Sequence, residues 1–245
     1  MRNGLMSIAA ILLLSACGVQ TAKKVEKFNF TTNPNGKGAE MLFEFSAGKA
    51  HNHPSMAIWM ETVDGTYIQT LYVTNYFAKG VFGNAPLSDT TWSNKPGPAR
   101  RPAGLPYWAH QRGIKAPDGT YNPTPENPIP DAYSGATPKG DFSLNSKSDA
   151  AAPEKFRILM EINQPWDWNT YWHNNKFPGD NDYKTSAQPS VVYAVMVSLT
   201  DENKEYYLNP IGHGHYSGKD GKLYTNLKFH TDALNIVDWA KVTLK

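Results

Sequence analysis

Proline and glycine punctuate the chain so densely that they restrict its fold more than any other feature. The 245 residues include 18 prolines and 19 glycines, and many of these fall between residues 75 and 140. Both "NKPGPARRPAGLPYW" and "DGTYNPTPENPIPD" occur in this region. Because proline lacks a backbone donor and fixes its own φ, long helices and regular sheet are excluded there. The sequence therefore predicts many turns and a long irregular stretch.

Outside this region, apolar and polar residues alternate as they do in half-buried strands. Residues 39–48 show the alternation, and the runs 55–63 and 66–74 flank Asp64-Gly65. This dipeptide favours a tight hairpin because glycine tolerates positive φ. A helical turn or two is expected within 226–238, and further strands are expected at 140–146, 154–164, 189–199, 204–212 and 235–245. The pattern predicts an antiparallel, immunoglobulin-like β-sandwich that forms a single domain over residues 39–245.

Two irregular insertions, 75–140 and 165–183, are expected to decorate one end of the sandwich. Loops of this length inside a compact domain are usually functional or disordered. The first insertion carries Trp92, Tyr107, Trp108 and Tyr121, and such aromatic side chains argue against disorder because they can be buried.

The amino-terminal segment predicts export and lipid attachment. Arg2 precedes a short apolar run, "MSIAAILLLSA", which is too short to span a bilayer and is typical of a signal peptide. It ends in "LSAC", which resembles a bacterial lipobox, so Cys17 is expected to carry lipid. The alternative for a lone cysteine is a small buried apolar residue. We expect residues 1–16 to be a lipoprotein signal peptide and 17–38 a tether, with the domain lipid-anchored in the cell envelope, in the periplasm or at the outer membrane.

Charge and motif content exclude several functions. The formal net charge is only +2, without the concentrated basic face that a nucleic-acid partner requires. The chain has one cysteine and lacks zinc-protease, nucleophile-elbow, P-loop and dinucleotide motifs. Ser46 and Lys49 match Ser-x-x-Lys, but the companion motifs of that acylating family are absent. No catalytic residues are therefore assigned, and the sequence does not predict an enzyme.

Two histidine pairs are candidate metal ligands. His51 and His53 lie in "HNHP", and His213 and His215 lie in "GHGH". On a regular strand this spacing places both imidazoles on one face, where they could bind a divalent metal ion. The alternative is that the histidines hydrogen-bond backbone groups in loops, since proline or glycine adjoins both pairs.

Aromatic residues in the second insertion form another candidate site. Trp166, Trp168, Tyr171 and Trp172 alternate with aspartate and asparagine. Flat rings beside amide and carboxylate groups could stack on a sugar or a flavin, or they could roof one end of the core.

The stretch "DAYSGAT", residues 131–137, resembles the attachment motif of proteins that carry covalently bound FMN. In those proteins a flavin transferase joins FMN to the final threonine through a phosphoester. Thr137 would supply the oxygen, Gly135 and Ala136 would let the backbone enter the transferase, and Asp131 and Ser134 would be recognition groups. Average composition produces such a match by chance in about one of two thousand chains of this length. The alternative is a turn at Ser134-Gly135 capped by Asp131.

Longer motifs resemble one bacterial family. They are "MAIWMETVDGTYIQTLYVT", "RRPAGLPYWAHQRG", "DAYSGATPKGDFSL", "FRILMEINQPWDWN", "AQPSVVYAV" and "GHGHYSGKDGKLY". Together they are similar to the uncharacterised family called domain of unknown function 2271, over roughly residues 39–240. The resemblance implies an envelope protein that works near flavin transferases and membrane redox proteins. It implies no established activity.

Two functional hypotheses follow from these features. The first is a lipid-anchored electron-transfer carrier with FMN on Thr137 and envelope redox proteins as partners. The second is a non-catalytic binding module that holds a metal ion through the paired histidines, or a glycan on the tryptophan cluster.

Overall fold

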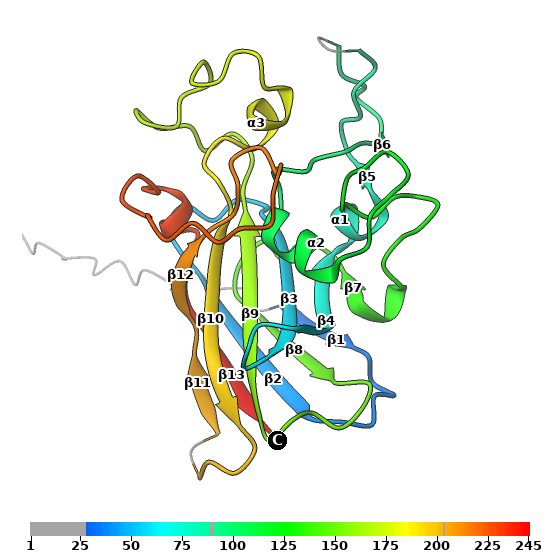
Figure 1. The fold of residues 1–245 in the computed structure, drawn as a ribbon, viewed down its shortest axis with the longest axis vertical. Coiled ribbons are helices and arrows are strands. Elements are labelled where there is room, and N and C mark those ends of the chain that lie inside the picture. The colour runs from blue at the N-terminus through cyan, green and yellow to red at the C-terminus, as the bar shows by residue number, and fades with distance from the viewer. Residues whose placement is uncertain (1–27, 89–90, 203) are drawn as a thin grey trace, which may run out of the picture.

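The protein folds as a β-sandwich of two mixed sheets (Figure 1). The computed structural model describes residues 28–88, 91–202 and 204–245. The first sheet has the strand order β1 (Phe28–Thr32), β8 (Phe142–Lys147), β2 (Glu40–Ala47), β13 (Val237–Leu244) and β11 (Glu205–Tyr207). The second has the order β12 (Asn209–His213), β10 (Val191–Ser198), β9 (Lys155–Asn163), β3 (Ser55–Thr62), β4 (Tyr67–Thr74) and β7 (Ser134–Gly135).

The main core lies between the two sheets. In β2, burial alternates along the strand, and Met41, Phe43 and Phe45 are the residues that point inward. They meet side chains of the facing sheet that include Met56 and Ile58 of β3. Each fully buried side chain of this size contributes about 1.5–3 kcal/mol, so the alternation determines which face of the sheet is buried.

A second core covers the outer face of the six-stranded sheet. Trp59 and Leu159 point away from the sandwich and pack against Phe77 and Trp108 of the first insertion. The insertion supplies α1 (Asn75–Lys79), α2 (Pro106–Arg112) and a small sheet of β5 (Val81–Phe82) and β6 (Gly97–Pro98). Because both faces of β3, β4 and β9 are covered, these strands are buried along nearly their whole length.

A buried carboxylate joins α2 to the sheet. Glu161 of β9 is fully buried and accepts hydrogen bonds from the backbone N–H groups of Tyr107, at 3.2 Å, and Trp108, at 2.7 Å. These are orphan donors of the first helical turn, and the side chain of Ser190 donates to the same carboxylate. Glu161 thus caps the helix from a strand about 50 positions away.

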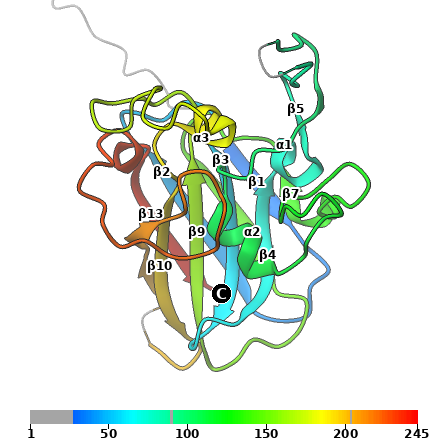
Figure 2. The same ribbon diagram turned by 45° about the horizontal axis from the view of Figure 1, so that its top comes forward.

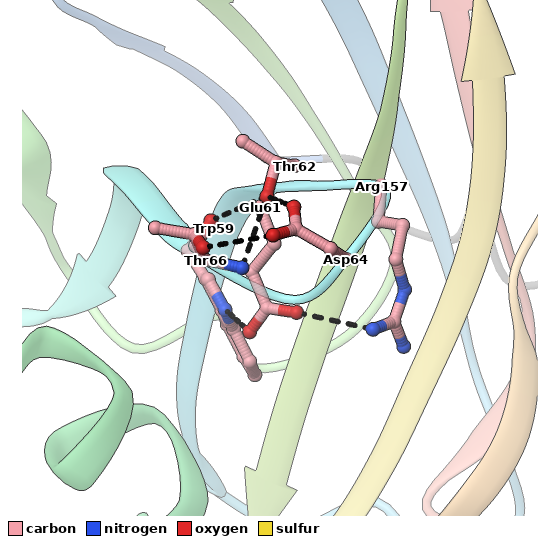
Figure 3. Close-up of polar contacts among 6 residues, drawn as sticks. All are labelled: Trp59, Glu61, Thr62, Asp64, Thr66 and Arg157. Carbon is pink, nitrogen blue, oxygen red and sulfur yellow. Dashed lines mark hydrogen bonds and ion pairs between the residues drawn. The ribbon is translucent and has the colours of Figure 1, made fainter.

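The β3–β4 hairpin forms at Asp64-Gly65, as predicted. The two strands are antiparallel, and Gly65 has a φ of +89°. Figure 3 shows the side chain of Asp64 over the turn, where it accepts a hydrogen bond from Thr62. Below the turn, the buried Glu61 accepts from Trp59 Nε1 at 2.8 Å and lies 3.3 Å from the Arg157 guanidinium of β9.

The predicted β-sandwich is confirmed, and three details of the prediction are wrong. Residues 28–32 form β1, which pairs in parallel with β8, so they belong to the sheet and not to the tether. The sheets are mixed and not purely antiparallel, because β4 and β7 also run parallel. The proline-rich insertion contains the helix α2, with Pro106 at its first position, where the missing N–H costs nothing. Immunoglobulin-like connectivity stays a prediction.

Both insertions reach the same end of the sandwich, as expected. The segment with β5 and β6 and the segment with α3 (Asn181–Ser186) rise from this end in both views (Figures 1 and 2). Ser186 Oγ of α3 donates to the Ala103 carbonyl of the first insertion at 3.3 Å. The short 3-10 turn η2 (Ala233–Asn235) matches the helical turn expected within 226–238.

Candidate functional site

The segment that carries Thr137 is an edge of the six-stranded sheet. Ser134 and Gly135 form β7, and they pair in parallel with Val73 and Thr74 of β4. A Cβ atom on Gly135 would lie 2.8 Å from Cε2 of Tyr72, so only glycine fits here without a shift. The alternative of a simple turn at Ser134-Gly135 is therefore wrong.

Asp131 and Ser134 occupy different surroundings within the motif. Asp131 begins the 3-10 helix η1 (Asp131–Tyr133), makes no side-chain cap and lies exposed, 3.2 Å from the Lys79 ammonium group. The hydroxyl of Ser134 is buried and has no hydrogen-bond partner. Asp131 is thus accessible to another protein, whereas Ser134 is not.

Two side chains hold the backbone on either side of Thr137. The Tyr72 hydroxyl donates to the Ala136 carbonyl at 2.7 Å, and burial raises the pKa of Tyr72. The Nε2 atom of His51 lies 3.1 Å from the Pro138 carbonyl, to which it donates. Thr137 itself is half-buried, so it occupies neither a free loop tip nor a buried turn.

Thr137 forms part of the wall of a pocket with a volume of about 390 Å³, which we call the threonine pocket. Its walls come from the β2–β3 loop with the start of β3, from the end of β4 with the first insertion, which includes Thr137, and from the second insertion with α3. The lining residues are His53, Ser55, Thr74, Tyr76, Phe82, Gly83, Asn84, Trp92, Arg101, Thr137, Pro165, Trp166 and Thr185.

Three aromatic residues of the threonine pocket are unusually exposed. Trp166 is 67% exposed, Tyr76 52% and Trp92 43%. Large aromatic side chains normally bury most of their surface, and exposed clusters of them mark binding sites. The pocket therefore presents flat apolar rings to solvent, and Thr137 lies in its wall.

Two lining residues also have a left-handed backbone. Trp166 has a φ of +70° and His53 a φ of +54°. They are two of the four non-glycine residues with positive φ in the part of the chain that the structure describes; the others are Asn33 and Ala187. Such a backbone costs about 1–3 kcal/mol per residue and is found preferentially at functional sites. The fold thus keeps two strained residues on one pocket.

Arg101 supplies the only cationic side chain among the described residues that line this pocket. Its guanidinium carbon lies 4.3 Å from the centre of the Phe82 ring, and its Nη2 donates to the Asn84 carbonyl at 3.3 Å. Its Nε atom is buried without a partner, and burial lowers the pKa of Arg101. No acidic side chain of a described residue pairs with Arg101.

A larger pocket of about 650 Å³ adjoins the first one and shares Trp92, Trp166 and Thr185 with it. The polar side chains of Asn174, Asn181 and Asp182 and the ring of Trp168 complete much of its lining. Trp166 therefore stands between two cavities at the surface.

The tryptophan-rich segment divides into two parts. Trp166 and Trp168 line the pockets, as a binding role requires. Tyr171 instead stacks on Phe229, with ring centres 3.8 Å apart. Trp172 is buried, and its ring centre lies 5.7 Å from that of His230. The burial of Trp172 agrees with the structural alternative, whereas Tyr171 is 39% exposed.

The two histidine pairs lie apart in the fold and differ in their contacts. His51 and His53 lie in irregular backbone between β2 and β3, where strand spacing does not apply. His213 ends β12, and its Nδ1 donates to the Gly214 carbonyl at 2.7 Å, while Nδ1 of His215 accepts from Ser217 N–H at 3.1 Å. Among the described residues, no group of three or more His, Cys, Asp or Glu side chains could hold a metal ion. A metal on either pair stays a prediction.

Sequence reasoning missed Arg101 and Tyr76 as site residues. Arg101 lies in the quoted stretch "RRPAG", but nothing in its neighbours distinguishes it from Arg100, which pairs with Asp118. Arg101 differs from Arg100 in having no ion-pair partner among the described residues, and this difference is visible only in the folded protein.

Comparisons with known proteins add no relatives: no family model, no curated protein and no solved structure matches this chain. The resemblance to domain of unknown function 2271 therefore stays a prediction. Cys17 and the signal peptide lie outside the described residues. No helix within the described ranges is both long and apolar enough to cross a membrane.

Proposed function

We propose that this protein is a lipid-anchored electron carrier of a bacterial cell envelope, with FMN bound covalently to Thr137. The observation that carries the proposal is the position of Thr137 in the wall of a pocket that also contains exposed aromatic rings and the half-buried guanidinium of Arg101. The motif from Asp131 to Thr137 supports the same assignment.

The residues present fit the parts of FMN. FMN has a flat tricyclic ring, a polar ribityl chain and a phosphate. The threonine pocket offers aromatic rings, the polar side chains of Ser55, Asn84 and Thr185, and the guanidinium of Arg101. Its volume of about 390 Å³ lies within the range of about 300–1,000 Å³ that is usual for small-molecule sites.

The attachment reaction requires a hydroxyl and an external transferase. The Thr137 oxygen attacks the phosphorus on the FMN side of FAD, and a new P–O bond forms. The bond to the AMP phosphate breaks, AMP leaves, and the threonine proton passes to a base of the transferase. Asp131 is exposed and is therefore available for recognition by that enzyme.

Bound flavin would supply one- and two-electron transfer, while the protein sets its position and surroundings. The hydrogen bonds from Tyr72 and His51 restrain the chain on both sides of the attachment point. The exposure of Trp166 and Tyr76 places the pocket at the surface, where the redox group of an envelope partner can approach.

Intact mass spectrometry after co-expression with an FAD:protein FMN transferase tests the proposal. We expect the exported protein to gain the mass of FMN less one water and to show in-gel flavin fluorescence. Thr137→Ala should lose both, whereas Thr185→Ala, which removes another threonine hydroxyl from the same pocket, should keep both. No mass gain, with the transferase active on a known acceptor, would refute covalent attachment.

Glycan binding is the second candidate, and the larger pocket favours it. Exposed Trp166 stands there beside Asn174, Asn181 and Asp182, and sugar-binding sites combine such rings with such polar groups. Titration with envelope oligosaccharides, followed by tryptophan fluorescence, would test it. Saturable binding by Thr137→Ala that disappears in Trp166→Ala would support a glycan site without flavin.

A further inference from the structure

The side chain of Arg101 is half-buried, and no acidic side chain of the described residues pairs with it. Removing part of a charge from water is unfavourable, and proteins normally compensate it with an opposite charge. Arg100 pairs with Asp118 and Arg157 with Glu61, whereas Arg101 has only the Phe82 ring and one carbonyl. The missing partner of Arg101 therefore points to an anionic ligand.

A second guanidinium in similar surroundings shows why the pocket matters. Arg112 is also half-buried, its guanidinium carbon lies 4.9 Å from the centre of the Trp108 ring, and its Nη1 is buried without a partner. The cavity beside Arg112 has a volume of only about 50 Å³, which cannot hold a phosphorylated ligand. Arg101 lines a cavity of about 390 Å³ together with Thr137. Arg112 thus provides a matched control.

Trp166 supplies an apolar surface to the same pocket. Its left-handed backbone and its 67% exposure are both unfavourable in free energy, and packing in the protein core compensates neither of them. An exposed indole that lines the same pocket as an arginine offers a stacking surface for a flat ring. The pocket therefore combines a ring-binding and an anion-binding group.

We propose that Arg101 binds the phosphate of the flavin and that Trp166 stacks on its ring system, so that the cofactor is fixed within the threonine pocket. This inference rests on the proposed function, since it concerns the same cofactor. The phosphodiester formed at Thr137 keeps one negative charge, and arginine recognises such oxygens through paired, charge-assisted hydrogen bonds. Arg101 and Trp166 are positioning residues here, and neither is needed for the attachment reaction itself.

Flavin fluorescence of the loaded protein tests the inference separately from attachment. Wild type, Trp166→Ala, Arg101→Gln and Arg112→Gln are each co-expressed with the transferase, and mass spectrometry establishes the loading of each. An indole stacked on a flavin quenches its emission, so emission per FMN should rise several-fold in Trp166→Ala. Arg101→Gln should give higher emission and lower anisotropy, because the flavin moves freely, and Arg112→Gln should match wild type. Arg101→Lys keeps the charge but loses the paired hydrogen bonds, so its emission and anisotropy should lie between those of wild type and Arg101→Gln, which separates loss of the anion contact from misfolding.

The outcomes distinguish the inference from the proposed function. If all variants carry FMN and show equal emission and anisotropy, attachment stands and the inference is overturned. If wild type gains no FMN, unloaded protein is titrated with free FMN and with riboflavin. A preference for FMN of about tenfold that disappears in Arg101→Gln supports the inference without covalent attachment. Equal binding of both compounds, or none, overturns it.

Discussion

The buried carboxyl group of Glu161 predicts an unusual dependence of stability on pH. Burial raises the pKa of Glu161 from 4.5 to about 7, although hydrogen bonds from Ser190, Trp108 and Tyr107 oppose the shift. Between these two values the folded protein binds a proton that the unfolded chain releases. The contribution of Glu161 to the free energy of unfolding therefore falls as the pH rises from 4.5 to about 7 and is constant above that range.

The size of the effect follows from the two pKa values. A difference of about 2.5 pH units, at 1.36 kcal/mol for each, corresponds to about 3 kcal/mol lost on going from pH 4 to pH 8. The side chain of Glu161→Gln cannot ionise, so the free energy of unfolding of this variant should lack the contribution. Burial lowers the pKa of His51 and His213, and this contributes stability that rises with pH. The quantity to compare is therefore the difference between variant and wild type.

Urea unfolding of both proteins at pH 4 and pH 8 measures that difference. We expect the stability of wild type relative to Glu161→Gln to fall by about 3 kcal/mol between the two pH values. Glu154→Gln is the control, since Glu154 is exposed and should show no such change. A constant difference between wild type and Glu161→Gln would refute the reasoning, because Glu161 would then have the same pKa in both states.

Three further predictions concern the segments around the threonine pocket. Trp166→Gly should leave the free energy of unfolding unchanged or raise it by up to about 1 kcal/mol, because glycine relieves the positive φ. Trp168→Gly removes an edge-to-face contact with Tyr183, so it should lower the free energy of unfolding in the same urea assay. Gly135→Ala should cost about 1–3 kcal/mol, since the added Cβ meets the Tyr72 ring at 2.8 Å; an unchanged urea midpoint would contradict this. Amides of residues 134–137 should exchange with deuterium faster than those of β9, because β7 is a two-residue edge strand; equal protection by mass spectrometry would contradict an accessible attachment segment.

Features encoded by neighbouring residues could be predicted from the sequence. The Asp64-Gly65 hairpin and the alternation in β2 depend on local backbone and burial, and the structure confirms both. The strand β1 and the helix α2 depend on distant partners. The partner of β1 is β8, more than 100 positions away, and α2 is capped by Glu161 of β9. Local patterns carry no signal of such partners.

The candidate site shows the same division. Thr137 could be predicted because its motif is contiguous. The sequence predicts His53 as a metal ligand, but its position in the pocket follows from the approach of segments that are far apart in the sequence. Arg101 and Tyr76 could not be selected, since exposed rings and a missing ion-pair partner are properties of the folded surface.

The second core explains how an irregular insertion can hold Arg101 in a defined place. The backbone carbonyl of Arg101 accepts hydrogen bonds from Gly104 N–H at 3.0 Å and from Asn122 Nδ2 at 3.1 Å, and these bonds restrain the backbone. Five residues further on, α2 begins on the Glu161 carboxylate, so the sheet anchors this part of the insertion. A ligand therefore meets an arginine whose backbone is already ordered, and little of its binding free energy is spent on ordering the loop. The same anchoring allows the fold to keep an unpaired cation beside Thr137.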